Sequence, residues 1–288
     1  MPKRSLMLAG GGLKIAFQAG VLQVWLDEAG LEFDHGDGVS AACFNLAMWA
    51  QGMSGRRIAD NWRNLKPIKG VALNWGQLIR PGFASSLFEL DAYRKRVFPA
   101  WGLDWGKIRA GGREATFNVY NFSKHELRPV TSEELTEDFL VATASLPLWF
   151  PPVRVGGDTY IDAVFNTPAN IEEALRRGAD ELWVVWTTSR RGLWKDGFLG
   201  NFFGIFEATT NHVYKQALAR IARNNDALAR GEPSEYGRHV TVRELAAEVP
   251  LHYLLNFSGK RIAEAVEMGV EAARAWCDEN QIPRRRDA

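Results

Sequence analysis

A serine set between a strand and a helix is the first group in this sequence that could do covalent chemistry. Ser40 follows a short run ending at Val39 and precedes the small, apolar stretch 41–51. A serine in such a turn is typical of a nucleophile elbow, where the residues two before and two after must be small so that strand and helix can approach. Gly38 and Ala42 occupy those positions. The alternative is a serine that caps the helix in an ordinary strand–helix turn.

Three consecutive glycines lie near the N-terminus. Gly10, Gly11 and Gly12 follow the apolar strand predicted over 5–9, and their backbone amides could donate hydrogen bonds to an oxyanion beside the elbow. A dinucleotide-binding turn is a second interpretation, because Gly10 and Gly12 fit two positions of that fingerprint, although Ile15 stands at the third. A Walker-type phosphate loop is excluded, because its motif is absent from the sequence.

A serine nucleophile needs a base, and Asp162 is the best candidate. It follows the strand predicted over 159–161 and precedes a turn of small residues. An aspartate is a weak base at its usual pKa of about 3.9, but burial would raise that pKa. An aspartate that only caps the turn is the alternative. The histidines are read as surface or packing residues: His35, His125, His212, His239 and His252.

The elements that must position these residues alternate between strands and helices. Strands are predicted to end at Val39 and to cover 5–9, 116–122, 127–130, 153–155, 159–161, 182–187 and 238–243. Helices are predicted over 15–28, 41–51, 54–66, 88–98, 169–177, 206–230 and 258–279, and from Thr131 to before Pro147, with 67–86 irregular. Strand, glycine turn and helix occur twice in succession at the start, which predicts a parallel α/β sheet.

Composition excludes several classes of protein. Of the 288 residues, 46% are hydrophobic, which rules out disorder for the bulk of the chain. Lys+Arg 35 against Asp+Glu 34 gives no support to nucleic-acid binding. Cys43 and Cys277 cannot build a disulfide framework, so a cytoplasmic location is expected, and residues 2–9 are read as a first strand rather than a signal peptide. No apolar run approaches the ~18–20 residues of a membrane span.

The sequence resembles the patatin-like phospholipases over roughly residues 5–188. The resemblance depends on the combination of Gly10-Gly11-Gly12-Leu13-Lys14, Ala19-Gly20-Val21-Leu22, Gly38-Val39-Ser40-Ala41, the run 142–153 and Asp162, in that order. It implies an α/β fold, a three-layer α/β/α sandwich with a mainly parallel central sheet. The chain is then one domain, 1–288, with the motifs in its first part and a helical C-terminal part over about 189–288.

The resemblance also implies a mechanism without histidine. Ser40 would be the nucleophile and Asp162 the base, while the amides of Gly10–Gly12, with Lys14 in the family's basic position, would make the oxyanion site. The activity implied is that of a lipid acyl hydrolase working through an acyl-enzyme, on a lipid or acyl-ester substrate, with peripheral contact to a membrane surface. No metal or other cofactor is expected, because no His/Cys/Asp cluster has ligand spacing.

The sequence departs from the family pattern in three places. Ala163 and Val164 follow Asp162 where the family has glycine and a second small residue, Ala42 replaces the second elbow glycine, and Ile15 replaces the glycine after the basic residue. All of them narrow the space around the dyad. A catalytically weak or inactive lipid-binding protein of the same fold therefore stands as the alternative function.

The most aromatic stretch, 192–206, has two interpretations. Four glycines interrupt it at 192, 197, 200 and 204, which disfavours one continuous helix. Its phenylalanines either cover the sheet as core residues or belong to a glycine-hinged flap that contacts lipid, with Lys195 near the headgroups.

Overall fold

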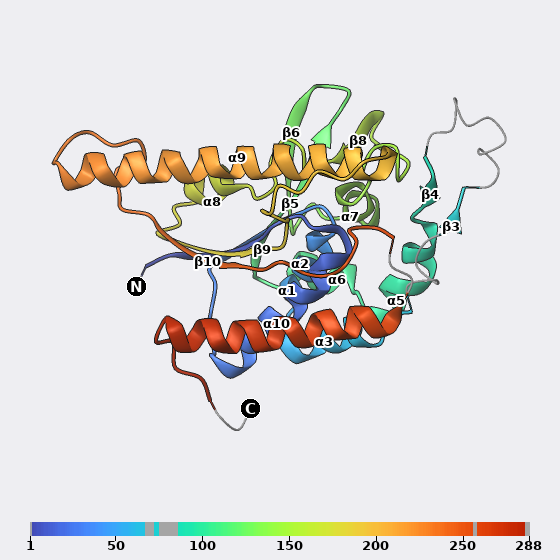
Figure 1. Ribbon diagram of the computed structural model, residues 1–288, viewed down its shortest axis with the longest axis horizontal. Helices are drawn as coiled ribbons and strands as arrows, with labels where there is room; N and C mark the ends of the chain where they lie inside the picture. The colour runs from blue at the N-terminus through green and yellow to red at the C-terminus, as the bar shows by residue number, and fades with distance from the viewer. Residues whose placement is uncertain (1, 67–71, 75–85, 256–257, 286–288) are drawn as a thin grey trace.

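A central sheet carries the residues of interest. The computed structural model describes residues 2–66, 72–74, 86–255 and 258–285 (Figure 1). Within them an eight-stranded sheet has the order β10-β9-β1-β2-β5-β8-β7, with β6 paired to β5. Its strands are β1 (Arg4–Leu8), β2 (His35–Val39), β5 (Glu114–Asn121), β6 (Glu126–Thr131), β7 (Val153–Val155), β8 (Asp158–Asp162), β9 (Glu181–Trp186) and β10 (Thr241–Ala246). Strands β3 (Ala72–Leu73) and β4 (Phe88–Glu89) form a separate pair.

Strand direction decides which loops meet. Strands β10, β9, β1, β2 and β5 are parallel neighbours, so their carboxyl ends lie at one edge of the sheet. Strand β8 runs antiparallel to β5 and pairs Asp162 with Val119. Because Val39 pairs with Asn118 on the other side of β5, this register brings the end of β8 close to the end of β2.

Helices cover both faces of the sheet. Figure 1 shows α10 with α1 and α3 on one face and α9 with α8 on the other. The side chains of β1 follow this division: Leu6 and Leu8 belong to the core on the α1 side, whereas Met7 belongs to the core on the α9 side.

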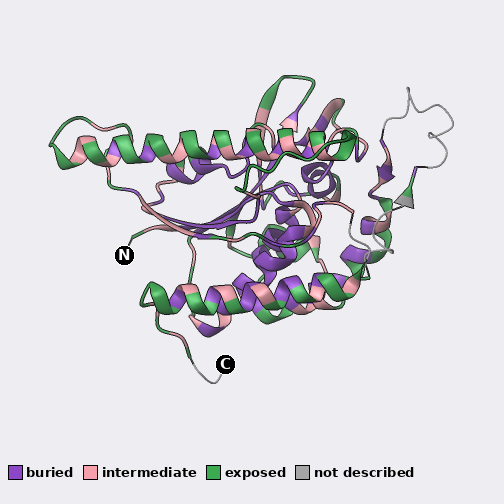
Figure 2. Ribbon diagram, viewed as in Figure 1, coloured by how far each residue is buried: buried purple, intermediate pink, exposed green. Residues whose placement is uncertain are grey.

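The helices are α1 (Ile15–Leu22), α2 (Ala42–Ala50), α3 (Gly55–Arg63), α5 (Phe98–Trp101), α6 (Trp105–Ala110), α7 (Glu137–Thr143), α8 (Ile171–Arg176), α9 (Phe198–Ala229) and α10 (Gly259–Glu279). Short 3₁₀ and π turns cover Gly12–Lys14, Gln23–Glu28 and Tyr93–Val97. The buried residues concentrate between the layers (Figure 2).

Two glycines let α1 and α10 touch backbone to backbone. A Cβ on Gly20 would lie 2.0 Å from the carbonyl oxygen of Val266, and a Cβ on Gly269 would lie 2.1 Å from that of Phe17. Neither distance is tolerable for a real side chain, so this crossing requires glycine on both helices. The C-terminal helix is therefore packed directly on the helix that follows the glycine loop.

The structure confirms the α/β class and most predicted elements, and it differs at four of them. The helix expected from Thr131 begins at Glu137, because Thr136 caps it and the Glu134 carboxylate binds Thr131 instead. Within 88–98, the first two residues form β4 rather than helix. The last strand begins at Thr241, three residues later than predicted. Helix α9 begins at Phe198 rather than 206 and runs through two of the glycines. Most of the predicted irregular stretch 67–86 lies outside the described residues.

Candidate active site

Ser40 lies in the turn between β2 and α2, at the edge where the parallel strands end. Its φ of 60° is in the left-handed region that residues with side chains rarely adopt, and a nucleophile elbow has this kind of strained backbone. Gly38 lets strand and helix approach, because a Cβ there would lie 3.1 Å from Leu46 Cδ2 and 3.3 Å from Cys43 Cα. Ala42 is fully buried at the first position of α2.

Asp162 meets Ser40 from the end of β8. The Ser40 hydroxyl donates a hydrogen bond of 2.6 Å to Asp162 Oδ2, across 122 positions of sequence. The Val164 amide donates to the other carboxylate oxygen at 2.9 Å. Burial raises the pKa of the Asp162 carboxyl to about 7, against the opposing effect of these two hydrogen bonds. An aspartate in this state can accept a proton near neutral pH.

Ser40 and Asp162 line an apolar cavity of about 60 Å³. Its aromatic and aliphatic walls include Phe44, Tyr93, Leu146, Phe150, Phe203 and Phe206. None of the five histidines, all within the described residues, lines it. A cavity with such walls suits a hydrocarbon chain rather than a polar ligand.

The glycine loop lies against this pair. A Cβ on Gly10 would lie 2.8 Å from Val164 Cγ2 and 3.1 Å from Ser40 Cβ, so glycine is needed for the close approach. The Gly10 amide already donates to the Pro168 carbonyl at 3.0 Å. Among the described residues no acceptor is found for the amides of Gly11 and Gly12, and Gly12 lines the cavity. These two amides remain as candidate oxyanion donors.

The amide of Ala41 is a further candidate donor, which the sequence analysis did not single out. Ala41 lines the cavity directly after Ser40, and no acceptor for its amide is found in the described part of the chain. In nucleophile elbows the residue after the nucleophile supplies one oxyanion donor. That rule was the available signal for this residue.

Lys14 is separated from the Ser40 cavity. Its side chain is 4% exposed, and its ammonium lies 4.1 Å from the centre of the Tyr253 ring. Its backbone amide donates to the Gly11 carbonyl at 3.1 Å. Burial lowers the pKa of the ammonium. The structure thus does not bring Lys14 together with Ser40 and Asp162, because the Lys14 side chain turns toward Tyr253 and a different cavity.

The buried carboxylate of Asp37 belongs to a hydrogen-bond network that includes the nucleophile elbow. Asp37 accepts hydrogen bonds from Thr116 Oγ1 at 2.5 Å, from Asn118 Nδ2 at 2.9 Å and from the Asn170 amide at 3.3 Å. Asn118 Nδ2 also donates to the Gly38 carbonyl at 2.9 Å, inside the elbow itself. Burial raises the pKa of Asp37 to about 7. These contacts join β2, β5 and the segment that follows Asp162.

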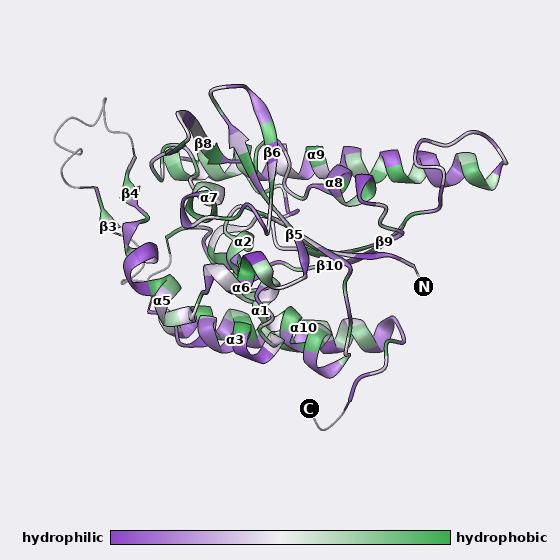
Figure 3. Ribbon diagram, turned by 180° about the vertical axis from the view of Figure 1, so that it is seen from behind, coloured by the Kyte–Doolittle hydropathy of each residue, from purple (hydrophilic) through white to green (hydrophobic). Residues whose placement is uncertain are grey.

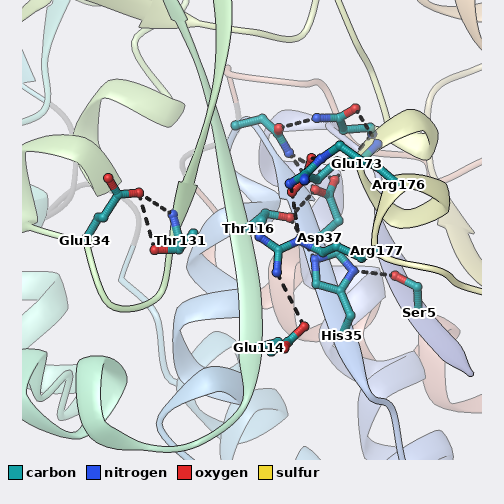
Figure 4. Close-up of polar contacts among 12 residues, drawn as sticks. Ser5, His35, Asp37, Glu114, Thr116, Thr131, Glu134, Glu173, Arg176 and Arg177 are labelled. Atoms are coloured by element: carbon teal, nitrogen blue, oxygen red, sulfur yellow. Dashed lines mark hydrogen bonds and ion pairs between the residues drawn. The ribbon is translucent and has the colours of Figure 1, made fainter.

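The same network extends to a buried histidine (Figure 4). Because the Thr116 hydroxyl donates to Asp37, its oxygen accepts from His35 Nε2 at 3.0 Å. His35 Nδ1 then accepts from the Ser5 hydroxyl at 2.8 Å. Burial lowers the pKa of His35 to about 3, so the ring stays neutral. His35 is thus a bonded core residue, as expected from the sequence.

A family model described as the patatin-like phospholipases matches residues 6–175. The chain belongs to the patatin-like phospholipase family. Among solved structures, the chain is similar to a crystal structure of VipD from Legionella pneumophila, with 16% identity, a TM-score of 0.49, and coverage of 96% of this chain and 67% of that chain. No curated protein matches. The matched region includes the glycine loop, Ser40 and Asp162.

No group of three His, Cys, Asp or Glu side chains in the described part of the chain is arranged to hold a metal ion. Over the same residues, no helix combines the length and the apolar character that crossing a membrane requires.

Proposed function

We propose that this patatin-like protein is a lipid acyl hydrolase in which Ser40 and Asp162 form the catalytic dyad. The observation that carries the proposal is the 2.6 Å hydrogen bond from the Ser40 hydroxyl to the Asp162 carboxylate, inside an apolar cavity. Membership of the family supports the class of reaction, hydrolysis of fatty-acyl esters.

The first half-reaction forms an acyl-enzyme. Ionised Asp162 takes the proton of Ser40 while Oγ attacks the ester carbonyl carbon, and the amides of Gly11, Gly12 and Ala41 stabilise the oxyanion. The tetrahedral intermediate collapses as the ester bond breaks. The leaving alcohol takes the proton from Asp162, which is left ionised for the second step.

The second half-reaction releases the fatty acid. Asp162 takes a proton from a water molecule, whose oxygen attacks the acyl-enzyme carbonyl. When that intermediate collapses, Ser40 Oγ leaves and recovers its proton from Asp162. Asp162 can serve in both steps without a histidine because its raised pKa of about 7 lies close to neutral pH.

Peripheral contact with a lipid surface belongs to the same proposal. Several large apolar side chains at the start of α9 and just before it are exposed: Leu193, Trp194, Phe198, Leu199 and Ile205, with exposed fractions from 41% to 66%. This end of α9 lies beside β8 and α7, near the end of β8 that carries Asp162 (Figures 1 and 3). Exposed aromatic groups beside an apolar cavity suit a membrane interface.

The decisive experiment is Ser40→Ala. We expect it to abolish hydrolysis of soluble and lipid esters while the protein stays folded, since alanine removes one hydrogen bond to Asp162, at a cost of about 1–2 kcal/mol in unfolding free energy. A fluorophosphonate probe should label wild-type Ser40 and nothing in the variant. Retained turnover in purified Ser40→Ala would refute the dyad, and an unlabelled, inert wild type would favour a lipid-binding protein without activity.

A further inference from the structure

The Ser40 cavity is lined by one polar side chain that the proposed reaction does not use. Apart from the dyad, the described residues around this cavity include two side chains with a polar atom, Tyr93 and Tyr253. The Tyr253 hydroxyl is engaged, because it donates to Glu207 Oε1 at 2.8 Å and accepts from the Ser189 amide at 3.0 Å. The Tyr93 hydroxyl is the group that is left.

This hydroxyl forms no hydrogen bond within the part of the chain that the structure describes. Tyr93 is nevertheless only 6% exposed. Burial raises the pKa of Tyr93 to about 12, so the hydroxyl keeps its proton and can donate at neutral pH. A buried donor without an acceptor costs free energy, and a ligand oxygen that accepts from it would remove that cost.

Aromatic packing fixes the Tyr93 ring close to the nucleophile. Phe44 follows Ser40 by one turn of α2, and the centre of its ring lies 5.3 Å from that of Tyr93. The rings of Phe98 and Trp101 lie 6.0 Å and 6.4 Å from the Tyr93 ring. A hydroxyl on a ring held by three neighbours has a defined position, as a group that selects among ligands requires.

The size of the cavity limits which part of a bound acyl chain Tyr93 can meet. The cavity measures about 60 Å³. An apolar cavity of about 150 Å³ holds one benzene molecule, so this one accommodates fewer than about six carbon atoms. A chain attached to Ser40 therefore reaches Tyr93 within about the first six carbons.

We propose that the Ser40 cavity selects an acyl chain that carries a hydroxyl or carbonyl oxygen, and that Tyr93 donates a hydrogen bond to this oxygen. The inference rests on the proposed function and narrows its substrates from acyl esters in general to esters of oxygenated acyl chains. In mostly apolar pockets a few polar groups fix the orientation of the ligand. A site with a buried donor also rejects an analogue that leaves this donor unpaired. Tyr93 is then a specificity-determining residue that takes no part in the proton transfers.

Binding to the Ser40→Ala chain tests this without turnover. Two pairs of ethyl esters probe the start and the end of a short chain: 3-hydroxyhexanoate with 3-methylhexanoate, and 6-hydroxyhexanoate with heptanoate. Within each pair a hydroxyl takes the place of a methyl group of similar size. NMR titrations give the affinity of the hydroxy ester relative to its methyl counterpart. In at least one pair, we expect Tyr93→Phe, added to Ser40→Ala, to lower this relative affinity roughly tenfold.

The matched control is Tyr214→Phe in the same chain. Tyr214 is a similarly buried tyrosine, 2% exposed, that does not line the Ser40 cavity, so the relative affinities should not change. Tyr93→Phe should keep or raise the Tm, because the hydroxyl that it removes has no bond to lose. Relative affinities that Tyr93→Phe leaves unchanged in both pairs, or an equal drop with Tyr214→Phe, would overturn the proposal. So would a clear fall in the Tm of Tyr93→Phe, which would mean that the hydroxyl is already bonded within the protein.

These outcomes do not depend on whether the wild type hydrolyses esters. If the wild type is inert toward esters and toward fluorophosphonate while Tyr93 still sets the relative affinity, the hydrolase is refuted and the recognition of the oxygenated chain remains. Hydrolysis through Ser40 with relative affinities that ignore Tyr93 would refute this recognition alone.

Discussion

At the scale of single residues, the burial of Asp162 raises the pKa of its carboxyl and carries a cost in stability. The carboxyl is 1% exposed, and its hydrogen bonds come from Ser40 and Val164. No cation pairs with it in the described part of the chain, so burial dominates and the pKa rises to about 7. The charged form that the proposed reaction needs is therefore the form that the fold disfavours.

The pH dependence of activity follows from this pKa. Asp162 must be ionised to take the Ser40 proton, so kcat/KM should fall as the pH drops through about 7 and level off above it. Initial rates with a soluble ester, measured from acid to mild alkali on folded protein, would check this. A profile that stays flat down to the usual pKa of an exposed aspartate, about 3.9, would contradict it.

Asp162→Asn should be inactive but more stable at alkaline pH. The native carboxyl binds its proton more tightly than the unfolded one, so wild-type stability falls as the pH rises from about 4 to the native pKa and stays low above it. Asparagine carries no charge, so we expect a Tm higher by about 2–4 °C at about pH 8 and a smaller difference toward about pH 4. A lower Tm at alkaline pH would show that the two hydrogen bonds outweigh the burial of the charge.

Asn118 should position the elbow without touching substrate. Asn118→Ala removes the donor to the Gly38 carbonyl, and we expect roughly tenfold slower fluorophosphonate labelling of Ser40. Turnover of a soluble ester should show the same loss mainly in kcat rather than as a rise in KM. Asn121→Ala is the control, since Asn121 is equally buried on β5 but bonds to Asp158 and Tyr160. Equal slowing in both variants would mean that only stability was lost.

At the scale of elements, the aromatic stretch 192–206 at the start of α9 contains both core residues and exposed residues that could contact lipid. Phe203 and Phe206 are buried and line the Ser40 cavity, as the core interpretation requires. Trp194 and Phe198 are 64% and 66% exposed, as a lipid-contacting surface requires. One segment therefore divides its aromatic residues between the cavity wall and the surface.

The double variant Trp194→Ser with Phe198→Ser tests the surface role. We expect at least about tenfold weaker binding to phospholipid vesicles, because two large apolar groups no longer enter the interface. Hydrolysis of a short soluble ester should change far less. The control is Phe203→Ala, which alters the cavity wall and should lower turnover of the soluble ester. If the double variant loses both activities together, the exposed residues are part of the site.

At the scale of the whole molecule, the C-terminal part is tied to the motif-bearing part. The family model ends at residue 175, in α8, while α9 and α10 lie beyond it. Yet α9 supplies walls of the Ser40 cavity, and the Tyr253 carbonyl accepts a hydrogen bond of 2.6 Å from the Leu13 amide in the glycine loop. Buried Glu28 binds Arg274 of α10 at 2.6 Å, which joins the first and last helical segments.

Gly269→Ala should therefore destabilise the whole protein. Its methyl group would meet the Phe17 carbonyl at 2.1 Å and push α10 from α1, at an expected cost of about 1–3 kcal/mol in unfolding free energy. Gly204→Ala in α9 is the control, because its Cβ would lie 3.4 Å from the Trp194 ring and alanine is the better helix former. Urea unfolding measures both. An unchanged midpoint for Gly269→Ala would show that the helix crossing relaxes freely.

The local features of the chain could be predicted from its residue types and their spacing. Gly38 and Ala42 around Ser40, and three glycines after a strand, predict tight turns because small residues are required wherever backbones approach closely. The alternation of apolar runs and helical patterns predicts the α/β class in the same way. The start of α7 was predicted wrongly, because Thr136 rather than Thr131 or Ser132 caps this helix.

The contacts between residues far apart in the sequence depend on strand pairing and packing across the whole chain. The pairing of Val119 with Asp162 brings that carboxylate to Ser40, and no pattern within either segment specifies this register. The direction of the Lys14 side chain was equally hidden, because it depends on Tyr253, more than two hundred positions away. Burial has the same origin: the pKa of Asp162 is raised because strands and helices from the whole chain exclude water from it.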